Sequence, residues 1–209
     1  MRLMLLFALV MITSCTTWDK NDMLILGNEK SDKAFVYLHG LDQDSPSEQE
    51  LNNRQILNRI GKELDVKFLA IRAIDHCPQF DNKLCWPQKT IEDLHGVKTR
   101  LDDVTQTYNI KGYVGFSNGG FYLNEAAQQG LLPSDTNIVS VGAGGTYNAD
   151  NANKVPRTFI IIGKNDTYQY KPSINLSKSL PNSVLFEFQG AHEMPYLELY
   201  KAVKQILRN

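Results

Sequence analysis

Several features are scarce in this sequence, and each absence excludes a class of protein. No segment approaches the roughly 18 consecutive apolar residues that a membrane-spanning helix needs. Lys and Arg number 22 against 23 Asp and Glu, a formal net charge of -1, so no basic excess is available for nucleic-acid phosphates. The sequence also has no internal repeat and no low-complexity tract. We therefore expect one globular domain, because 209 residues suffice for one core but hardly for two, and no nucleic-acid partner.

The first residues are typical of an export signal. Arg2 is followed by a short apolar run over residues 3–12, which fits a secretory signal peptide rather than a spanning helix. The motif Ile12-Thr13-Ser14-Cys15 then resembles a bacterial lipobox, whose cysteine receives lipid and becomes the new N-terminus. This resemblance implies a signal peptide over 1–14, a lipidated tether over 15–32 and a folded domain over 33–209. The alternative is a soluble secreted protein in which Cys15 has no such role.

The residue after the lipobox cysteine indicates a destination. Thr16, not Asp, follows Cys15, and by the sorting rule of such lipoproteins this resembles delivery to the outer membrane. Several acyl chains on one residue would anchor the protein stably, whereas a single chain would not. The expected location is therefore the bacterial cell envelope, with the membrane as a partner through the lipid on Cys15 and the side of the outer membrane left open.

Only two further cysteines occur. Cys77 and Cys85 lie 85 − 77 = 8 positions apart, and export would place them where disulfides persist. This favours a bridge that closes a small loop, with two unpaired thiols as the alternative. Two cysteines with only His76 nearby do not make a tetrahedral set of ligands. We therefore expect no metal site here, and the chemistry outlined below requires no cofactor.

Short apolar runs alternate with helix-like stretches along the rest of the chain. The runs are nearly unbroken and rich in β-branched residues, which is typical of strands buried on both faces of a sheet; they span residues 34–38, 66–71, 112–116, 138–142, 158–162 and 184–188. Such alternation predicts an α/β fold, with a mostly parallel sheet flanked by helices on both faces. The short gap between the fourth and fifth runs leaves no room for a cap domain.

Helix starts are marked by capping residues. Ser45 with Pro46 and Glu48 forms a capping box that predicts a helix from Pro46. Thr90 precedes apolar residues at spacings of three and four, and a last amphipathic stretch begins near Pro195. In an open parallel sheet the site lies beyond the carboxyl ends of the strands, so the residues that follow each strand are the ones to inspect.

The third apolar run ends in a turn that suits a nucleophile. The sequence Gly115-Phe116-Ser117-Asn118-Gly119-Gly120 leads into a helical stretch. A strand, a tight turn with small residues on both sides, and a helix form a nucleophile elbow, which lifts the serine hydroxyl above the sheet edge. Ser117 is therefore the candidate nucleophile, and the alternative is a plain strand-to-helix turn.

A serine hydroxyl needs a base, and the base needs an acid to orient it. Of the four histidines, only His192 follows Ser117 in the chain, in the loop after the sixth run. Asp166 directly follows the fifth run, so both side chains are expected at the same edge as Ser117. For Asp166 the alternative is a helix N-cap, and for His192 a surface position in its loop.

An oxyanion needs two preorganised donors. One is expected to be the backbone N–H of Asn118, directly after the serine. The other is expected from the loop after the first run, His39-Gly40-Leu41, where Leu41 N–H is our choice and His39 braces the loop. Aromatic residues in loops at the same edge could line a substrate pocket, among them Trp86, Tyr147 and Tyr168, although packing alone could explain each.

At this point the chain resembles the α/β-hydrolase superfamily over roughly residues 33 to 208. The His39-Gly40-Leu41 loop and the serine elbow are similar to those of carboxylesterases, phospholipases and acyl-protein thioesterases, whose nucleophile, acid and base fall on Ser117, Asp166 and His192. The resemblance implies a serine hydrolase that cleaves carboxylic esters or thioesters, with a small-molecule or polymer ester as substrate. A non-catalytic envelope lipoprotein and a peptidase or amidase on the same scaffold are the alternatives. Acyl length, leaving group and oligomeric state stay open.

Overall fold

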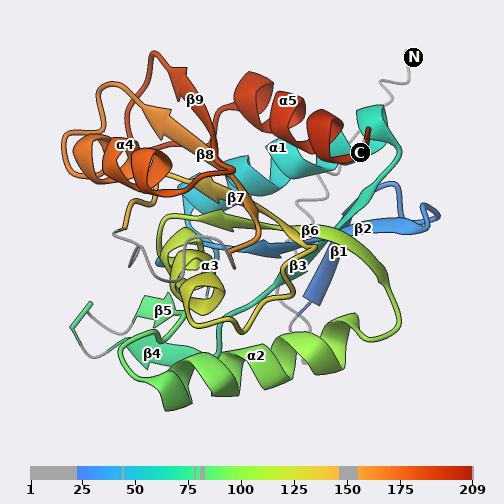
Figure 1. The fold of residues 1–209 in the computed structure, drawn as a ribbon. Helices are drawn as coiled ribbons and strands as arrows, with labels where there is room; N and C mark the ends of the chain where they lie inside the picture. The colour runs from blue at the N-terminus through green and yellow to red at the C-terminus, as the bar shows by residue number, and fades with distance from the viewer. Residues whose placement is uncertain (1–22, 44, 78, 81–82, 146–154, 209) are drawn as a thin grey trace, which may run out of the picture.

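The computed structural model describes residues 23–43, 45–77, 79–80, 83–145 and 155–208. Seven strands form one sheet in the order β1-β3-β2-β6-β7-β8-β9, and only β1 runs antiparallel to its neighbour (Figure 1). The sheet is therefore mostly parallel, which confirms the predicted fold class. Its strands are β1 Met23–Gly27, β2 Lys33–Leu38, β3 Lys67–Ile71, β6 Asn109–Phe116, β7 Asn137–Val141, β8 Arg157–Gly163 and β9 Val184–Phe188.

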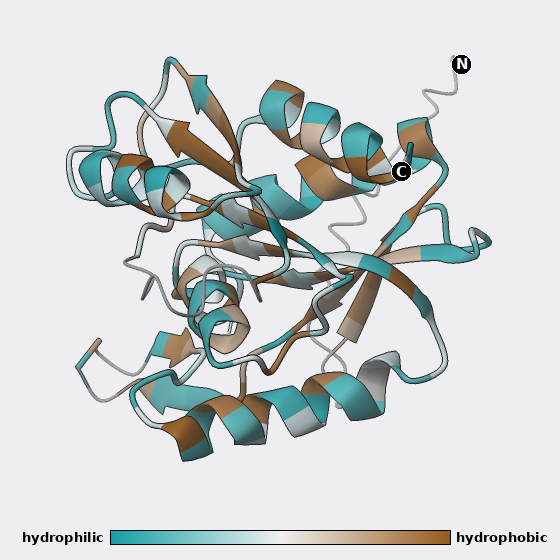
Figure 2. Ribbon diagram, in the orientation of Figure 1, coloured by the Kyte–Doolittle hydropathy of each residue, from teal (hydrophilic) through white to brown (hydrophobic). Residues whose placement is uncertain are grey.

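Helices cover both faces of this sheet. One buried cluster joins the sheet to α1 and α5, and a second joins its other face to α2, α3 and α4. Along β2, Phe35 and Tyr37 enter the first cluster while Val36 and Leu38 enter the second, as the alternation of a doubly covered strand requires. Figure 2 shows the resulting contrast between hydrophobic central strands and helices that are hydrophilic on their outer sides. The helices are α1 Glu48–Leu64, α2 Ile91–Thr105, α3 Asn118–Gln128, α4 Tyr170–Ser179 and α5 Tyr196–Ile206.

The folded domain begins before the predicted boundary. The sequence predicts a tether over residues 15–32, but Met23–Gly27 forms β1 and pairs antiparallel with β3, with Met23 opposite Ile71. The apolar side chains of this strand pack against both buried clusters. The strand is favoured because it buries these side chains and because it pairs the backbone N–H and C=O groups along the edge of β3. Residues 1–22, including Cys15, lie outside the described residues.

Helix α1 also starts later than the capping box predicts. Its N-cap is Ser47, whose hydroxyl accepts a hydrogen bond from the Glu50 N–H at 3.2 Å. The Ser47 N–H in turn donates to Asp42 Oδ1 at 2.9 Å. These bonds fix the helix start at Glu48, two residues beyond Pro46. At α2 the capping box of Thr90 and Asp93 is present as expected. None of the described helices is long and apolar enough to cross a membrane.

A small hairpin stands apart from the main sheet. Strands β4 Asp75–Cys77 and β5 Lys83–Cys85 pair antiparallel, and Cys77 and Cys85 form a disulfide with a Cα–Cα distance of 5.8 Å. Leu84 also exchanges two backbone hydrogen bonds with Asp42, in the loop after β2. The hairpin is thereby tied to the carboxyl edge of the sheet, where the candidate site lies.

Candidate active site

Ser117 occupies a strained turn between β6 and α3. Its backbone has φ 49° and ψ −115°, a region that side-chain-bearing residues rarely adopt. The turn brings strand and helix so close that a Cβ on Gly115 would lie 2.6 Å from the carbonyl carbon of Gly119. A Cβ on Gly119 would lie 2.7 Å from the carbonyl oxygen of His39. Glycine at both positions therefore permits the close approach that an elbow requires.

Ser117, His192 and Asp166 are joined by hydrogen bonds. Ser117 Oγ lies 2.9 Å from His192 Nε2, and His192 Nδ1 lies 2.6 Å from Asp166 Oδ2. A carboxylate can only accept, so Nδ1 carries the imidazole proton and Nε2 is free to accept from the serine hydroxyl. The three residues come from the ends of β6, β8 and β9, which meet at one edge of the sheet.

Burial fixes the acid and leaves the base accessible. The Asp166 side chain is 2% exposed and that of His192 is 37% exposed. Asp166 Oδ1 also accepts from the Gln169 N–H at 3.0 Å, so the carboxylate holds the turn before α4 while Oδ2 faces the imidazole. The N-cap of α4 is Gln169, with no side-chain capping bond, so Asp166 is the partner of His192 and not the helix N-cap of the alternative interpretation. The ring of Phe116 lies 5.2 Å from that of His192 and supports it.

Two backbone N–H groups belong to residues that line the cavity beside Ser117. Leu41, Ser117 and Asn118 line the same cavity. Within the described part of the chain, neither the Leu41 nor the Asn118 N–H donates to another protein group. The loop that carries Leu41 is joined to α3 by a bond from the Gly119 N–H to the His39 carbonyl at 3.1 Å. These are the two donors that the sequence predicts for an oxyanion.

His39 is a structural residue of this loop. Its Nε2 accepts from the Ala73 N–H at 2.9 Å, and its Nδ1 donates to the Gly40 carbonyl at 2.5 Å. Burial lowers the pKa of His39 to about 4, because an imidazolium would lose its hydration. A neutral ring suits this arrangement, since Nε2 must keep its lone pair. His39 therefore braces the loop, as the sequence predicts, and lies outside the hydrogen-bonded group of Ser117.

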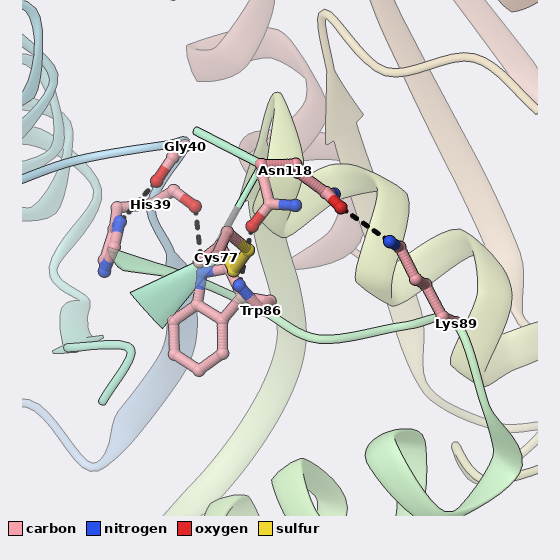
Figure 3. The surroundings of a disulfide bond; sticks show 8 residues. His39, Gly40, Cys77, Trp86, Lys89 and Asn118 are labelled. Atoms are coloured by element: carbon pink, nitrogen blue, oxygen red, sulfur yellow. Dashed lines mark hydrogen bonds between the residues drawn. A yellow bond between two sulfur atoms is a disulfide. The ribbon is translucent and has the colours of Figure 1, made fainter. Parts of the chain in front are cut away.

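A cavity of about 400 Å³ opens beside Ser117 and is walled by the disulfide hairpin. Trp86, directly after β5, is nearly fully buried and makes two hydrogen bonds (Figure 3). Its indole N–H donates to the His39 carbonyl at 2.9 Å, and its backbone N–H donates to Asn118 Oδ1 at 2.6 Å. Trp86 thus contacts both segments that carry the free N–H groups. The cavity walls also include Phe80, Pro87, Gln88, Lys89 and Phe121.

The aromatic residues that the sequence analysis suggested as pocket residues differ in their position relative to the cavity. Trp86 lines the cavity, whereas Tyr168 is 85% exposed and does not line it. Tyr168 follows β8 at the correct edge, but its turn points outward because Asp166 anchors it from inside. Tyr147 lies outside the described residues. The sequence analysis did not predict that Phe121 lines the cavity or that β4 and β5 pair as a hairpin beside it. Position was the available indication, because residues 75–89 follow β3 at the edge that carries Ser117.

Behind the loop lies a buried polar group that the sequence does not reveal. Tyr37 donates to Glu50 Oε2 at 2.8 Å, and Arg54 Nε donates to Glu50 Oε1 at 2.9 Å. Desolvation raises the pKa of Glu50 to about 7. This group holds the start of α1 against β2. Among the described residues no cluster of His, Cys, Asp and Glu could hold a metal ion.

Comparison with known proteins reveals relatives in structure only. No family model and no curated protein matches the sequence. Many solved structures are similar, however, including TT1662 of Thermus thermophilus (14% identity, TM-score 0.61, 90% of this chain and 94% of that one). Est1E of Butyrivibrio proteoclasticus, with ferulic acid bound, is 15% identical (TM-score 0.60, 89% and 93%).

A lipase-esterase related protein of Clostridium acetobutylicum is also similar, at 17% identity with a TM-score of 0.58, covering 89% of this chain and 96% of that one. These structures share the mostly parallel sheet and its flanking helices. The chain has an α/β-hydrolase fold. At such low identity the likeness concerns the fold, and the α/β-hydrolase fold hosts many reactions, so the reaction must be argued from the site.

Proposed function

We propose that this protein is a serine hydrolase that cleaves carboxylic esters, or thioesters, through an acyl-enzyme intermediate. The observation that carries the proposal is the continuous path of hydrogen bonds from Ser117 Oγ through His192 to the buried Asp166. The serine stands at a strained elbow beside two free backbone donors and a mostly apolar cavity. These parts together match the roles of a serine triad.

The geometry supports a two-step reaction. Ser117 Oγ attacks the acyl carbon as His192 Nε2 takes the hydroxyl proton, and Asp166 stabilises the resulting imidazolium. When the bond from the acyl carbon to the leaving group breaks, the imidazolium gives that proton to the leaving group. Water then attacks the acyl carbon and gives a proton to His192, which returns it to Ser117 Oγ as the carboxylic acid departs. The N–H groups of Leu41 and Asn118 bind the oxyanion in both steps.

The proposal is tested by ester turnover. The full chain should hydrolyse p-nitrophenyl acetate or butyrate, and Ser117→Ala should lose several orders of magnitude in kcat, because the triad acts as a unit. Ser183→Ala removes a serine at the opposite edge of the sheet and should retain the wild-type rate. Wild-type turnover by the Ser117→Ala variant, or no hydrolysis of any ester by the unaltered protein, contradicts the assignment.

Two other functions are separated by further measurements. A binding module with this fold would stay unlabelled when a fluorophosphonate probe is added, whereas a serine hydrolase is labelled at Ser117. A peptidase or amidase would turn over amides faster than the matching esters. The cavity walls of Phe80, Trp86 and Phe121 make methyl ferulate a useful additional substrate, since ferulic acid is bound in the Butyrivibrio proteoclasticus structure.

The N-terminal motif adds an envelope anchor to this proposal. Cleavage before Cys15 and acylation of its amino group and thiol would tether the hydrolase to a membrane. Mass spectrometry of the mature N-terminus tests this, with Cys15→Ser as the control that cannot accept lipid. Fractionation of the envelope then tests delivery to the outer membrane, which the Thr16 position favours.

A further inference from the structure

The exposed hydrophobic side chains of this protein are gathered at one edge. Six large hydrophobic residues are exposed in the described part of the chain, and all six lie in segments at the carboxyl edge of the sheet, the edge that also carries Ser117; Phe80 among them lines the cavity. We call this set the rim. It consists of Leu51, Ile74, Phe80, Ile91, Tyr168 and Leu197.

The topology explains why these six residues share an edge. Leu51, Ile91 and Leu197 lie in the first turns of α1, α2 and α5, and a helix that follows a parallel strand begins at the carboxyl edge. Ile74, Phe80 and Tyr168 lie in segments that follow β3, β4 and β8. The Gln49 side chain of the α1 start donates to the His192 carbonyl at 2.8 Å, which places this part of the rim beside the catalytic histidine.

Folding alone does not account for the rim. Single exposed hydrophobic residues are ordinary, but their concentration around a site marks an interaction surface. Ile74 is 54% exposed and Leu197 is 52% exposed, so each leaves much of its apolar area in water. No large hydrophobic residue is comparably exposed at the opposite edge within the described ranges.

The start of the described chain indicates what this surface faces. Because β1 is antiparallel, Met23 lies opposite Ile71, the last residue of β3, and therefore at the same carboxyl edge as Ser117. From Cys15 to Met23 the chain has 23 − 15 = 8 Cα-to-Cα steps, which can reach at most about 28 Å. A domain of this length has a radius of gyration of about 16 Å and is about 40 Å across. A lipid on Cys15 would thus keep the carboxyl edge near the membrane.

We propose that the rim docks on the surface of the lipid bilayer to which Cys15 is anchored, and that Ser117 acts on apolar esters that reside in the lipid layer. This inference rests on the proposed hydrolase function and on the proposed anchor. Docking buries the rim side chains among the lipids and opens the cavity mouth to them. The substrate then reaches Ser117 from the membrane rather than from solution.

The charges at the rim favour a neutral lipid surface. The first turns of α1, α2 and α5 carry Glu48, Glu92, Asp93 and Glu198, where carboxylates suit the helix dipoles. These acids oppose attraction to anionic lipids. Docking by burial of apolar area depends little on salt, whereas a polybasic contact would weaken as salt rises. We therefore expect binding to zwitterionic phosphatidylcholine that persists at high salt.

A probe of depth tests the surface without reference to activity. The lipidated full chain is reconstituted in phosphatidylcholine vesicles with an environment-sensitive fluorophore on Ile91→Cys, and in the control on Asn182→Cys at the opposite edge. Nitroxide-bearing lipids should quench the rim probe at least threefold more than the control probe, at low and high salt. Equal quenching at the two positions overturns the proposal. The proposal is also overturned if, without vesicles, the rim probe becomes buried as the protein concentration rises, because the rim would then bind a second copy of this chain.

Turnover tests the substrate class. The variant Ile74→Ser/Ile91→Ser/Leu197→Ser should lose at least tenfold in hydrolysis of a long-chain fluorogenic ester dissolved in the vesicles, and should keep p-nitrophenyl acetate hydrolysis within twofold. Asp135→Ser/Asn182→Ser replaces two exposed residues at the opposite edge and should keep both rates. Equal retention of vesicle turnover in the rim variant overturns the proposal, as does a Cys15 that carries no lipid. If the rim probe is quenched but the protein cleaves no ester, the proposed hydrolase function is refuted while the proposed docking surface still holds.

Discussion

Replacing Trp86 by Phe removes one hydrogen-bond donor and keeps most of the ring that fills the cavity wall. The lost bond joins the indole N–H to the His39 carbonyl at 2.9 Å, while the bond from the Trp86 backbone N–H to Asn118 Oδ1 can persist. The His39 carbonyl keeps the Gly119 N–H, at 3.1 Å. The substitution therefore weakens the attachment of the loop that carries Leu41, while the phenyl ring still fills most of the space that Trp86 occupies in the cavity wall.

The expected magnitudes follow from these contacts. A buried neutral hydrogen bond contributes about 0.5–1.5 kcal/mol to stability, so the free energy of unfolding should fall by about 1 kcal/mol. Loss of a whole oxyanion donor costs about 10²–10³ in kcat. Because Trp86 positions the loop and does not itself bind the oxyanion, we expect a smaller loss of about tenfold in kcat, or about 1.4 kcal/mol. KM should stay within twofold.

The assay is steady-state hydrolysis of p-nitrophenyl butyrate, with thermal unfolding measured on the same samples. Tyr122→Phe is the matched control, since it removes a buried hydroxyl that donates to the Leu94 carbonyl at 3.2 Å and keeps the ring that lies beside Trp86. The control should lose similar stability and keep kcat within twofold. If Trp86→Phe keeps the wild-type kcat, or changes only KM, the reasoning about loop positioning is wrong.

Three further outcomes are expected. Asp166→Asn should lower kcat about 10⁴-fold at neutral pH because the imidazole is held in the wrong tautomer, and a loss below tenfold would argue against its role. Cys77→Ser/Cys85→Ser should lower the free energy of unfolding by about 2–3 kcal/mol in denaturant titrations; unchanged stability would contradict a structural disulfide. The folded-state pKa of Glu50 is raised to about 7, so its stabilisation is complete below the unfolded value of about 4.5 and is lost as pH rises through 7. Glu50→Gln should therefore remove a decline in stability between pH 5 and 8, and an identical decline in both proteins would refute this.

Much of the fold and the candidate site could be predicted from the sequence. The central strands are unbroken apolar runs, and their ends carry Ser117, Asp166 and His192. Because parallel strands end at one edge, residues 26 and 75 positions from His192 could be expected to meet. The small residues around Ser117 are required by the close approach of the strand and the helix at that turn. This requirement is local, so it could be recognised in the sequence.

Other features of the structure could not be predicted from the sequence, because they depend on contacts between residues far apart in the chain. Strands β4 and β5 have three residues each, too few for periodicity to show, and β1 is a strand only because the edge of β3 is free to pair with it. Glu50 occupies a position that local sequence assigns to a helix surface, yet Tyr37 and Arg54 draw it into the interior. The rim likewise appears only when exposure is known.

The most direct test of the account is to find where the acyl group is held during turnover. The protein is mixed with p-nitrophenyl butyrate, quenched in acid within the first turnovers, digested, and its peptides are analysed by mass spectrometry. We predict a butyryl group on the hydroxyl of Ser117, and none on this peptide in Ser117→Ala. A butyryl group on another residue, or an enzyme that turns over the ester while this peptide stays unmodified, would contradict the account.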